Sequence, residues 1–472
     1  MTKSLALRNI LLETIGAIAD RQSLSAYVVG GYVRDLMLGS EVRDMDIVVL
    51  GDGIAFAGVV AREMKQGNLV TFPKFGTAML TLGESKVEFV GARKESYDRN
   101  SRKPAVAQGT LEDDLLRRDF TINAMAISLN KADRGRLVDP HGGQDDLKKK
   151  ILQTPLNPKQ TFDDDPLRIM RAMRFAAQLG FFIEDGILRA AREMKDRLKI
   201  VSQERISEEF LKTMMARKPS AGLLPMQETG VMEVVFPEMA RLSGVDQRQE
   251  HHHKDVFLHT LKVIDNISEN TPNVWLRMAA LMHDIAKPKT KAFKEGTGWT
   301  FHGHEEVGAR MVKPLFRRMK LPLDHVPYVE KLVRLHLRPM ALVDEGVTDS
   351  AVRRLLYEAS EEIDDLMTLC RADITSKNPK LVNQVKGNYE RVAQKMAEVE
   401  EKDRMRRWRP ALDGEEIMRV CGIEPGRMVG HLKQAVVDAI LDGKIPNDHD
   451  AALDYLNSIK DPILRRGESG RP

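Results

Sequence analysis

The N-terminal part of the chain alternates short apolar runs with polar turns, the pattern of a sheet with a few helices. The β-favouring run Tyr27–Val29 predicts a strand that stops at Gly30 and Gly31. The mix of apolar and charged residues over Tyr32–Leu38 then predicts a short helix, with Gly39 as its C-terminal stop. A second apolar run, MDIVVL, predicts the next strand, so the order is strand, glycine turn, helix, loop and strand.

Further strands and helices complete this N-terminal part. Helices are expected over about Leu5–Ala19 and over Ile54–Met64, where Ala and Val are frequent. Strands are predicted at NLVTF, TAMLTL and KVEFVGA, between residues 68 and 92. The polar and basic stretch from Arg93 to Thr110 has no periodicity and is predicted to be a mobile loop.

Beyond about residue 150 the apolar positions recur at helical spacing, and the chain from about Val245 is predicted to be all-helical. Aromatic residues are scarce at 5%, whereas Leu, Ala, Met, Lys, Arg and Glu are frequent, which favours helices. The 472 residues suffice for about three ordinary domains. The expected fold class is α+β, with strands and helices in the N-terminal part and helices after it.

Composition excludes several classes of protein. Hydrophobic residues at 42% and charged residues at 30% exclude a mostly disordered chain. The two cysteines, Cys370 and Cys421, are too few for a disulfide framework and favour a reducing compartment. The sequence shows neither a signal peptide nor a run of the roughly 20 apolar residues that cross a bilayer, so we expect a cytoplasmic protein with no membrane partner. The net charge of +4 permits binding to a polyanion without arguing for it.

Two carboxylates enter the strand MDIVVL. Asp44 and Asp46 are two residues apart, so on a strand their side chains point to the same face. Like charges held this close are costly unless a cation lies between them, and hard oxygen ligands suit magnesium. Glu88, with apolar neighbours on the third of the later strands, is a candidate third carboxylate. The alternatives are a solvated acidic strand end and an exposed edge-strand glutamate.

The glycine pair Gly30–Gly31 comes shortly before these carboxylates. A glycine turn that opens a helix can bring backbone N–H groups and the positive end of the helix dipole against a triphosphate. Together with Asp44 and Asp46, the pair leads to the hypothesis of a two-metal site for nucleotidyl transfer that uses Mg²⁺.

Two adjacent arginines lie in the segment LLRRDFTINAMAISL. On a helix, Arg117 and Arg118 would diverge by about 100° and would not serve one exposed stripe. Guanidinium groups are suited to bidentate contacts with phosphate, although a solvated surface pair is the commoner outcome.

The segment TFDDDPLRIMRAMRF combines carboxylates with arginines at intervals of three residues. Asp163–Asp165 are expected at a helix start, where the helix dipole favours them, and Arg168, Arg171 and Arg174 follow along one face. Asp165 offers acceptors and Arg168 offers donors, and together they can mimic a Watson–Crick edge. The alternative is a surface ion pair worth a few tenths of a kcal/mol.

Histidine and aspartate recur over the predicted helices of the C-terminal half, in the order H, HD, H, H, D. Buried His and Asp side chains need partners, and imidazoles with carboxylates suit Mn, Ni, Fe, Zn or Mg. We therefore predict a one- or two-metal site whose metal the sequence does not identify. Its candidate ligands are His259, His283, Asp284, His304, His336 and Asp373.

Taken in order, these motifs resemble the class II tRNA nucleotidyltransferase and bacterial poly(A) polymerase family, which is related to polymerase beta-type nucleotidyltransferases. The resemblance rests on GGYVRDLMLG with RDMDIVV, RRDFTINAMA, DPHGGQDDLKKKIL, DDPLR in place of the usual EDxxR, and VSQERISEEF. The histidine series resembles an HD-type phosphohydrolase domain. Four parts are then implied: a catalytic head over 1–150 with the mixed sheet of a polymerase beta-like nucleotidyltransferase, a helical neck over 151–245, an HD domain over 246–380 and a helical tail over 381–472 that contacts tRNA.

The resemblance also implies roles for single residues. Gly31 and Arg34 would approach the triphosphate, Arg117 and Arg118 would assist, and Asp165 with Arg168 would select the base. The set expected to bind the nucleotide is Gly30, Gly31, Arg34, Arg117, Arg118, Asp165, Arg168, Arg171 and Arg174. His259, His283, Asp284 and Asp373 would be primary ligands of the HD metal, with His304 and His336 available to a second one.

The implied function is addition of C, C and A to tRNA 3′ ends from CTP and ATP, without a template. A poly(A) polymerase and an enzyme that adds only A or only the two C residues are alternatives within the family. The loop that is short in the CC-adding members is not visibly shortened here. From another class, the chain could be an HD phosphohydrolase with an RNA-binding head.

Overall fold

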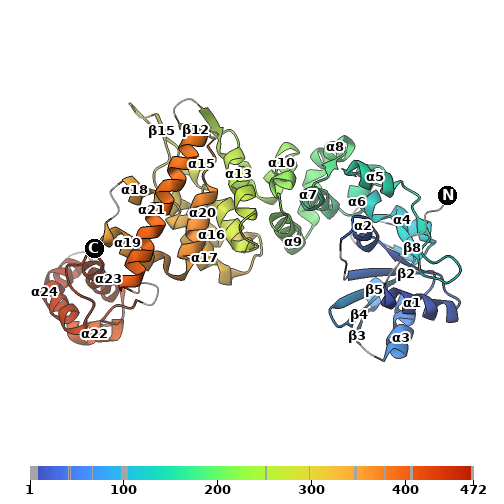
Figure 1. The fold of residues 1–472 in the computed structure, drawn as a ribbon, viewed down its shortest axis with the longest axis horizontal. Helices are drawn as coiled ribbons and strands as arrows, with labels where there is room; N and C mark the ends of the chain where they lie inside the picture. Colours follow the sequence, from blue (N-terminus) through green and yellow to red (C-terminus); the bar gives the residue numbers. More distant parts are fainter. Residues whose placement is uncertain are drawn as a thin grey trace. The chain divides into compact units, whose positions relative to one another are not determined.

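A seven-stranded mixed sheet forms the centre of the N-terminal unit (Figure 1). Its strand order is β3-β4-β5-β2-β1-β8-β9, and only β2 and β5 run parallel among neighbours. The strands are β1 Ala26–Val29, β2 Asp44–Val49, β3 Asn68–Phe72, β4 Thr77–Leu82, β5 Ser85–Gly91, β8 Ala126–Ser128 and β9 Leu137–Val138. The predicted mixed sheet is confirmed, and the bounds of β3 and β4 are those that the sequence predicted.

This computed structural model contains two compact units, Met1–Arg241 and Leu242–Pro472. It describes residues 9–40, 42, 44–65, 67–96, 105–249, 252–296, 298–344, 348–376, 378–403 and 408–468. No helix within these ranges is both long and apolar enough to span a bilayer.

The two faces of the sheet pack against different helices. On one face Phe89 of β5 packs edge-on against Phe56 of α3 (Gly53–Met64), with ring centroids 5.8 Å apart. On the other face a buried cluster contains Val48 of β2, Val90 of β5 and Leu115 of α4 (Leu111–Leu116). Side chains alternate along a strand, so Asp44, Asp46 and Glu88 share this second face.

Helices make up most of the rest of the N-terminal unit. Beside the sheet lie α1 Ile10–Arg21, α2 Gly31–Met37 and α5 Gly143–Lys149. The helices that follow are α6 Pro158–Asp164, α7 Leu167–Leu179, α8 Asp185–Met194, α9 Gln203–Met214, α10 Ser220–Glu228, α11 Val231–Val235 and α12 Pro237–Ala240. One short parallel pair, β10 (Ile151–Leu152) with β11 (Phe182–Ile183), interrupts them.

The predicted loop from Arg93 to Thr110 is wrong at both ends. β6 (Arg93–Ser96) and β7 (Ala105–Gln108) pair as an antiparallel hairpin, and Thr110 caps α4. Residues 97–104 lie outside the described ranges. The basic stretches RMRRWRP and RRGESGRP and the first residues of the predicted N-terminal helix also fall partly outside them.

The C-terminal unit is mainly helical. Its helices are α13 Val256–Ser268, α14 Val274–Met282, α15 Lys287–Thr290, α16 His304–Arg318, α17 Val326–Leu335, α18 Arg338–Asp344, α19 Asp349–Ala359, α20 Ile363–Ala372, α21 Pro379–Asp403, α22 Gly414–Cys421, α23 Arg427–Leu441 and α24 His449–Glu468. The last three enclose a small core of their own around Leu432, Val436 and Leu456.

Two hairpins contradict an all-helical reading of this unit. β12 (Asp246–Gln249) pairs with β13 (His252–Asp255), and β14 (Ala292–Lys294) pairs with β15 (Gly298–Thr300). The helix before His283 ends at Met282, and Pro288 lies in the first turn of α15. That position needs no backbone N–H donor, which is why proline is tolerated there.

Candidate active sites

The glycine turn and the carboxylates meet at the end of β1. Gly30 has φ +72° and caps the N-terminus of α2. A Cβ atom on Gly30 would lie 2.7 Å from Nη1 of Arg118 and 3.4 Å from Oδ2 of Asp46, so a larger residue would be strained by the positive φ and would crowd Arg118. β1 pairs Val29 with Asp46. The turn, Asp46 and Arg118 therefore occupy one site.

Strand register adds the third carboxylate. In the parallel pair of β2 and β5, Asp46 lies opposite Glu88. Burial raises the pKa of the Asp46 carboxyl, an effect that Arg118 opposes and Asp44 reinforces. Burial also raises the pKa of Glu88, and the charge of Asp46 adds to it. Asp44, Asp46 and Glu88 share one face of the sheet, and carboxylate oxygens suit a divalent cation. Among the described residues, however, only two groups of side chains in the C-terminal unit bring three ligand atoms within 4.8 Å of one another.

Arg117 and Arg118 do not diverge as a continuous helix would require. α4 ends at Leu116, and both guanidinium groups turn back to the buried carboxylate of Asp114. Arg118 lies 3.1 Å from Asp114. Burial raises the pKa of Asp114, but the two arginines outweigh burial and lower it. Sequence analysis missed Asp114, whose spacing of three and four residues to the arginines was the available signal.

α7 carries the remaining arginines of the head site. Arg171 donates to Asp119 over 2.7 Å, and Arg174 donates to Glu209 of α9 over 2.5 Å. Both carboxylates are buried. Phe175 lies beneath the arginines, with the guanidinium carbon of Arg174 3.9 Å from its ring centre. These pairs fix the two arginines as cations in a partly buried wall.

Arg34 belongs to the same wall. Its guanidinium group donates to Asp35 over 2.7 Å and to Asn123 over 2.8 Å, and it lies 5.0 Å from the ring centre of Phe175. Asn123 in turn donates to Asp119 over 3.0 Å. Burial raises the pKa of Asp119, but Arg171 and Asn123 outweigh burial and lower it to about 2.

The predicted helix start at Asp163–Asp165 is wrong. Asp163 and Asp164 end α6, and Asp165 is extended, with φ −143° and ψ 103°, before Pro166 and the start of α7. A residue before proline is pushed out of the helical region, which explains the break. The side chain of Asp165 accepts from Leu167 N over 3.1 Å and from Arg205 over 3.0 Å.

Arg168 does not pair with the side chain of Asp165 in this structure. Its guanidinium group donates to the carbonyl of Arg117 over 2.6 Å and to that of Thr161 over 3.2 Å. The surface ion pair offered as an alternative is therefore not what forms, because the two side chains contact different segments of the head and neck.

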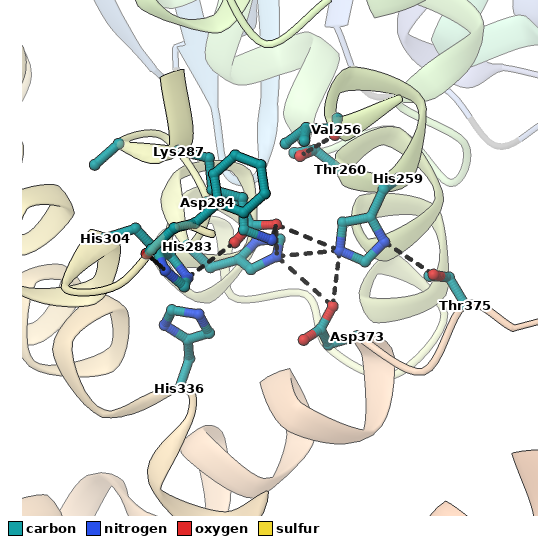
Figure 2. Close-up of polar contacts among 12 residues, drawn as sticks. Val256, His259, Thr260, His283, Asp284, Lys287, His304, His336, Asp373 and Thr375 are labelled. Atoms are coloured by element: carbon teal, nitrogen blue, oxygen red, sulfur yellow. Dashed lines mark hydrogen bonds and ion pairs between the residues drawn. The ribbon is translucent and has the colours of Figure 1, made fainter. Parts of the chain in front are cut away.

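The six candidate ligands of the C-terminal unit come together in two sets (Figure 2). One set is His259, His283 and Asp373, and the other is Asp284, His304 and His336; within each set the ligand atoms all lie within 4.8 Å of one another. Five of the six residues stand at or next to helix ends, and His259 lies in the first turns of α13.

Asp284 lies between the two sets. Its Oδ2 is 3.1 Å from Nε2 of His283 and 3.5 Å from Nε2 of His259, while its Oδ1 is 3.3 Å from Nε2 of His304. Asp373 completes the first set, with Oδ1 2.9 Å from Nε2 of His259. One carboxylate thus reaches both sets, as in a site for two neighbouring cations.

Backbone contacts orient three of the rings. Nδ1 of His283, His304 and His336 lies 2.7, 2.8 and 2.7 Å from the carbonyl oxygen three residues earlier. A carbonyl only accepts, so each Nδ1 donates and each Nε2 is left to face the site. The buried Nε2 of His304 and Oδ1 of Asp284 face each other 3.3 Å apart, so both ligand atoms point to the same place.

The charges inside this site are strongly coupled. Burial lowers the pKa of His283, but Asp284 and Asp373 outweigh burial and raise it to about 9. Burial and the neighbouring His283 lower the pKa of His336 to about 4. Burial raises the pKa of Asp284, but His283 and Lys287 reverse the shift and hold it well below its usual range. The carboxylates therefore attract positive charge, and the residues present fit a divalent cation.

Lys287 is a member of this site that sequence analysis missed. Its buried Nζ donates to Oδ2 of Asp284 over 2.7 Å. Its position three residues after Asp284 gave a signal for the pair, but burial of the lysine could not be read from spacing alone.

Three family profiles match the chain. The poly A polymerase head domain matches residues 26–153, the probable RNA and SrmB-binding site of polymerase A matches 180–242, and the HD domain matches 256–378.

Curated relatives and solved structures are similar over most of the chain. An A-adding tRNA nucleotidyltransferase from Deinococcus radiodurans is 31% identical over 90% of this chain and 94% of its own length. A CC-adding tRNA nucleotidyltransferase from Thermus thermophilus is also 31% identical, over 90% of this chain and 92% of its own. A CCA-adding enzyme in its apo form I superposes with a TM-score of 0.62 at 25% identity, over 95% of this chain and 93% of the other. The chain belongs to the family of tRNA nucleotidyltransferases and poly(A) polymerases.

Proposed function

We propose that the protein adds C, C and A to the 3′ ends of tRNA from CTP and ATP without a template. The observation that carries the proposal is the register of β2 and β5, which sets Asp46 opposite Glu88 beside the Gly30 turn. The relatives' names supply tRNA as the acceptor. The four-part division into head, neck, HD domain and tail remains part of this proposal.

Asp44, Asp46 and Glu88 would hold Mg²⁺. When bound, such cations activate the attacking hydroxyl of the RNA and stabilise the charge on the triphosphate and the departing pyrophosphate. Gly30 leaves room for phosphate beside Asp46, and the first N–H groups of α2 have no acceptor within the helix. Arg118, held by Asp114, supplies fixed positive charge next to Asp46.

Base selection is proposed for Asp165 and Arg168. Two backbone carbonyls hold the guanidinium group of Arg168, and Arg205 holds the carboxylate of Asp165. These side chains would rotate away from those contacts to present donors and acceptors to a base. Arg34, Arg171 and Arg174 would position the nucleotide from the wall around Phe175. Their carboxylate partners keep these arginines in place between turnovers.

The test is an end-addition assay. tRNA that lacks its last one, two or three nucleotides is offered with CTP, ATP or both, and the products are sequenced. Full CCA addition supports the proposal. Addition of A alone or of C alone identifies the narrower activities that the two relatives carry, and long A tails identify a poly(A) polymerase.

A second activity is proposed for the six-ligand site: hydrolysis of phosphate esters or cyclic phosphates. The bridging position of Asp284 and the inward Nε2 atoms favour it. A bound divalent cation would polarise a phosphoryl oxygen and lower the pKa of water. Hydrolysis of a 2′,3′-cyclic nucleotide by the wild-type protein and its loss in His283→Gln would support this activity. The two free cysteines and the tRNA substrate lead us to propose the cytoplasm as the place of action.

A further inference from the structure

A hairpin beside the six-ligand site carries two exposed aromatic side chains. Phe293 of β14 and Trp299 of β15 lie opposite each other, with ring centroids 5.4 Å apart and ring planes at 75°. They remain 64% and 38% exposed. Exposed large aromatic rings side by side are a surface that a flat ligand can stack on.

The segment that leads into this hairpin is positively charged. From Lys287 to Phe301 the chain has four lysines and a single acidic residue, Glu295; Lys287 and Lys289 lie in α15, Lys291 directly before β14, and Lys294 in β14. Nζ of Lys291 lies 4.5 Å from the ring centre of Trp299. Lys289, Lys291 and Lys294 form no ion pair with any residue in the described part of the chain. Their charge is available to a polyanion.

The base of the hairpin is joined to the ligands. Asp284 precedes it and His304 follows it, so the hairpin is the segment between two members of one ligand set. Lys287, which binds Asp284, lies 5.8 Å from the ring centre of Phe301, and the carbonyl of Phe301 accepts from His304. Phe301 directly follows β15, the strand that carries Trp299.

We propose that this hairpin binds the unpaired end of an RNA strand and leads it to the six-ligand site. Bases stack on Trp299 and Phe293, and the exposed lysines contact the phosphates. The delivery of the RNA end to the six-ligand site rests on the hydrolytic activity proposed above, whereas the binding of RNA to the hairpin does not. Aromatic rings interleaved with lysines favour nucleic acid over an acidic peptide, because a peptide side chain gains little from a stacking face.

A purely structural role is the competing explanation. Cross-strand aromatic pairs stabilise hairpins, and Phe293 with Trp299 would then need only to cover each other. The two explanations predict different effects when Trp299 is replaced by leucine or by phenylalanine. Leucine keeps apolar area but has no π-face, whereas phenylalanine keeps both.

The experiment measures binding of a fluorescein-labelled, single-stranded RNA tetranucleotide to the full-length protein by anisotropy. We expect Trp299→Phe to bind within about twofold of wild type, and Trp299→Leu and Phe293→Leu to bind about tenfold more weakly. Unlabelled tetranucleotide should quench tryptophan fluorescence in the wild type, and Trp299→Phe should lose that quenching. Phe75→Leu, at a ring 67% exposed in the other unit, is the matched control and should bind like wild type.

Equal affinity of the Leu and Phe variants, or quenching that persists in Trp299→Phe, would overturn the proposal. Each variant is compared by thermal unfolding, and Trp299→Phe tests the surface even if Trp299→Leu misfolds. His283→Gln separates the two proposals. If it loses hydrolysis and keeps tetranucleotide binding, both stand, and if the wild type binds but never hydrolyses, only the hydrolytic activity fails.

Discussion

The head and the six-ligand site both gather carboxylates, but they balance the charge differently. In the head, Asp46 and Glu88 lie side by side with raised pKa values, and Arg118 offsets them only in part. In the C-terminal unit, Asp284 and Asp373 have lowered pKa values because protonatable histidines and Lys287 surround them. The head carboxylates that we propose to hold Mg²⁺ therefore have little neighbouring positive charge, whereas a metal in the other site would compete with the histidines and Lys287 for the same carboxylates.

The largest expected effect is on the rate of nucleotide addition, which should depend on the head site and not on the six-ligand site. Asp46→Asn removes half of the charge of the Asp44–Asp46 pair, and we expect nucleotide addition to fall at least about a thousandfold, as when a group that stabilises transition-state charge is lost. His283→Ala should leave the initial rate of addition within about twofold. Primer-extension rates at saturating CTP measure both. Comparable losses in the two variants would mean that the sites are not independent.

The arginine wall should be sensitive to loss of one partner. Asp119→Ala leaves Arg171 without its closest carboxylate, and we expect a loss of about 3–5 kcal/mol in the free energy of unfolding. Asp145→Ala, which breaks an exposed pair with Lys148, is the control and should lower the free energy of unfolding far less, because water screens an exposed pair. Urea unfolding followed by circular dichroism measures the difference. Similar costs for the two variants would contradict a buried, structural pair.

Binding of Mn²⁺ should stabilise the Asp46→Asn variant against unfolding and should stabilise the His283→Gln variant much less. At a free Mn²⁺ concentration 100 times the dissociation constant, a single site contributes about 2.7 kcal/mol to stability. We expect EDTA-treated Asp46→Asn to show most of the Mn²⁺-dependent rise in the unfolding midpoint and His283→Gln to lose most of it, since the preformed ligand sets lie in the C-terminal unit. The reverse pattern would place the tight site in the head.

The smallest effect concerns acid stability. The folded pKa of Asp119 is lowered to about 2, so its contribution is complete above the unfolded pKa and is lost as the pH falls through the folded pKa. The shift corresponds to about 2.5 kcal/mol, lost between roughly pH 5 and pH 1. Asp119→Asn should flatten this part of the stability curve. If the Asp119→Asn variant loses stability at low pH as the wild type does, other carboxylates account for that loss.

Local pattern predicted the pieces of both sites but not their partners. The strand that holds Asp44 and Asp46, and β3 and β4 beyond it, follow from β-favouring apolar runs of short length. The helix expected to begin at Asp163 failed because Pro166 forces its neighbour to be extended. The hairpin of Phe293 and Trp299 was missed because three-residue strands carry too little periodicity to detect.

By itself, the sequence determined the order of motifs, the face shared by two aspartates and the set of six metal-ligand candidates, because these depend on residue type and on spacing along one strand or helix. Only the tertiary structure decided that Glu88 lies opposite Asp46, that Asp119 holds Arg171 across 52 positions, and that Asp284 reaches both ligand sets. Such contacts depend on strand register, helix ends and burial, which arise from packing between distant segments.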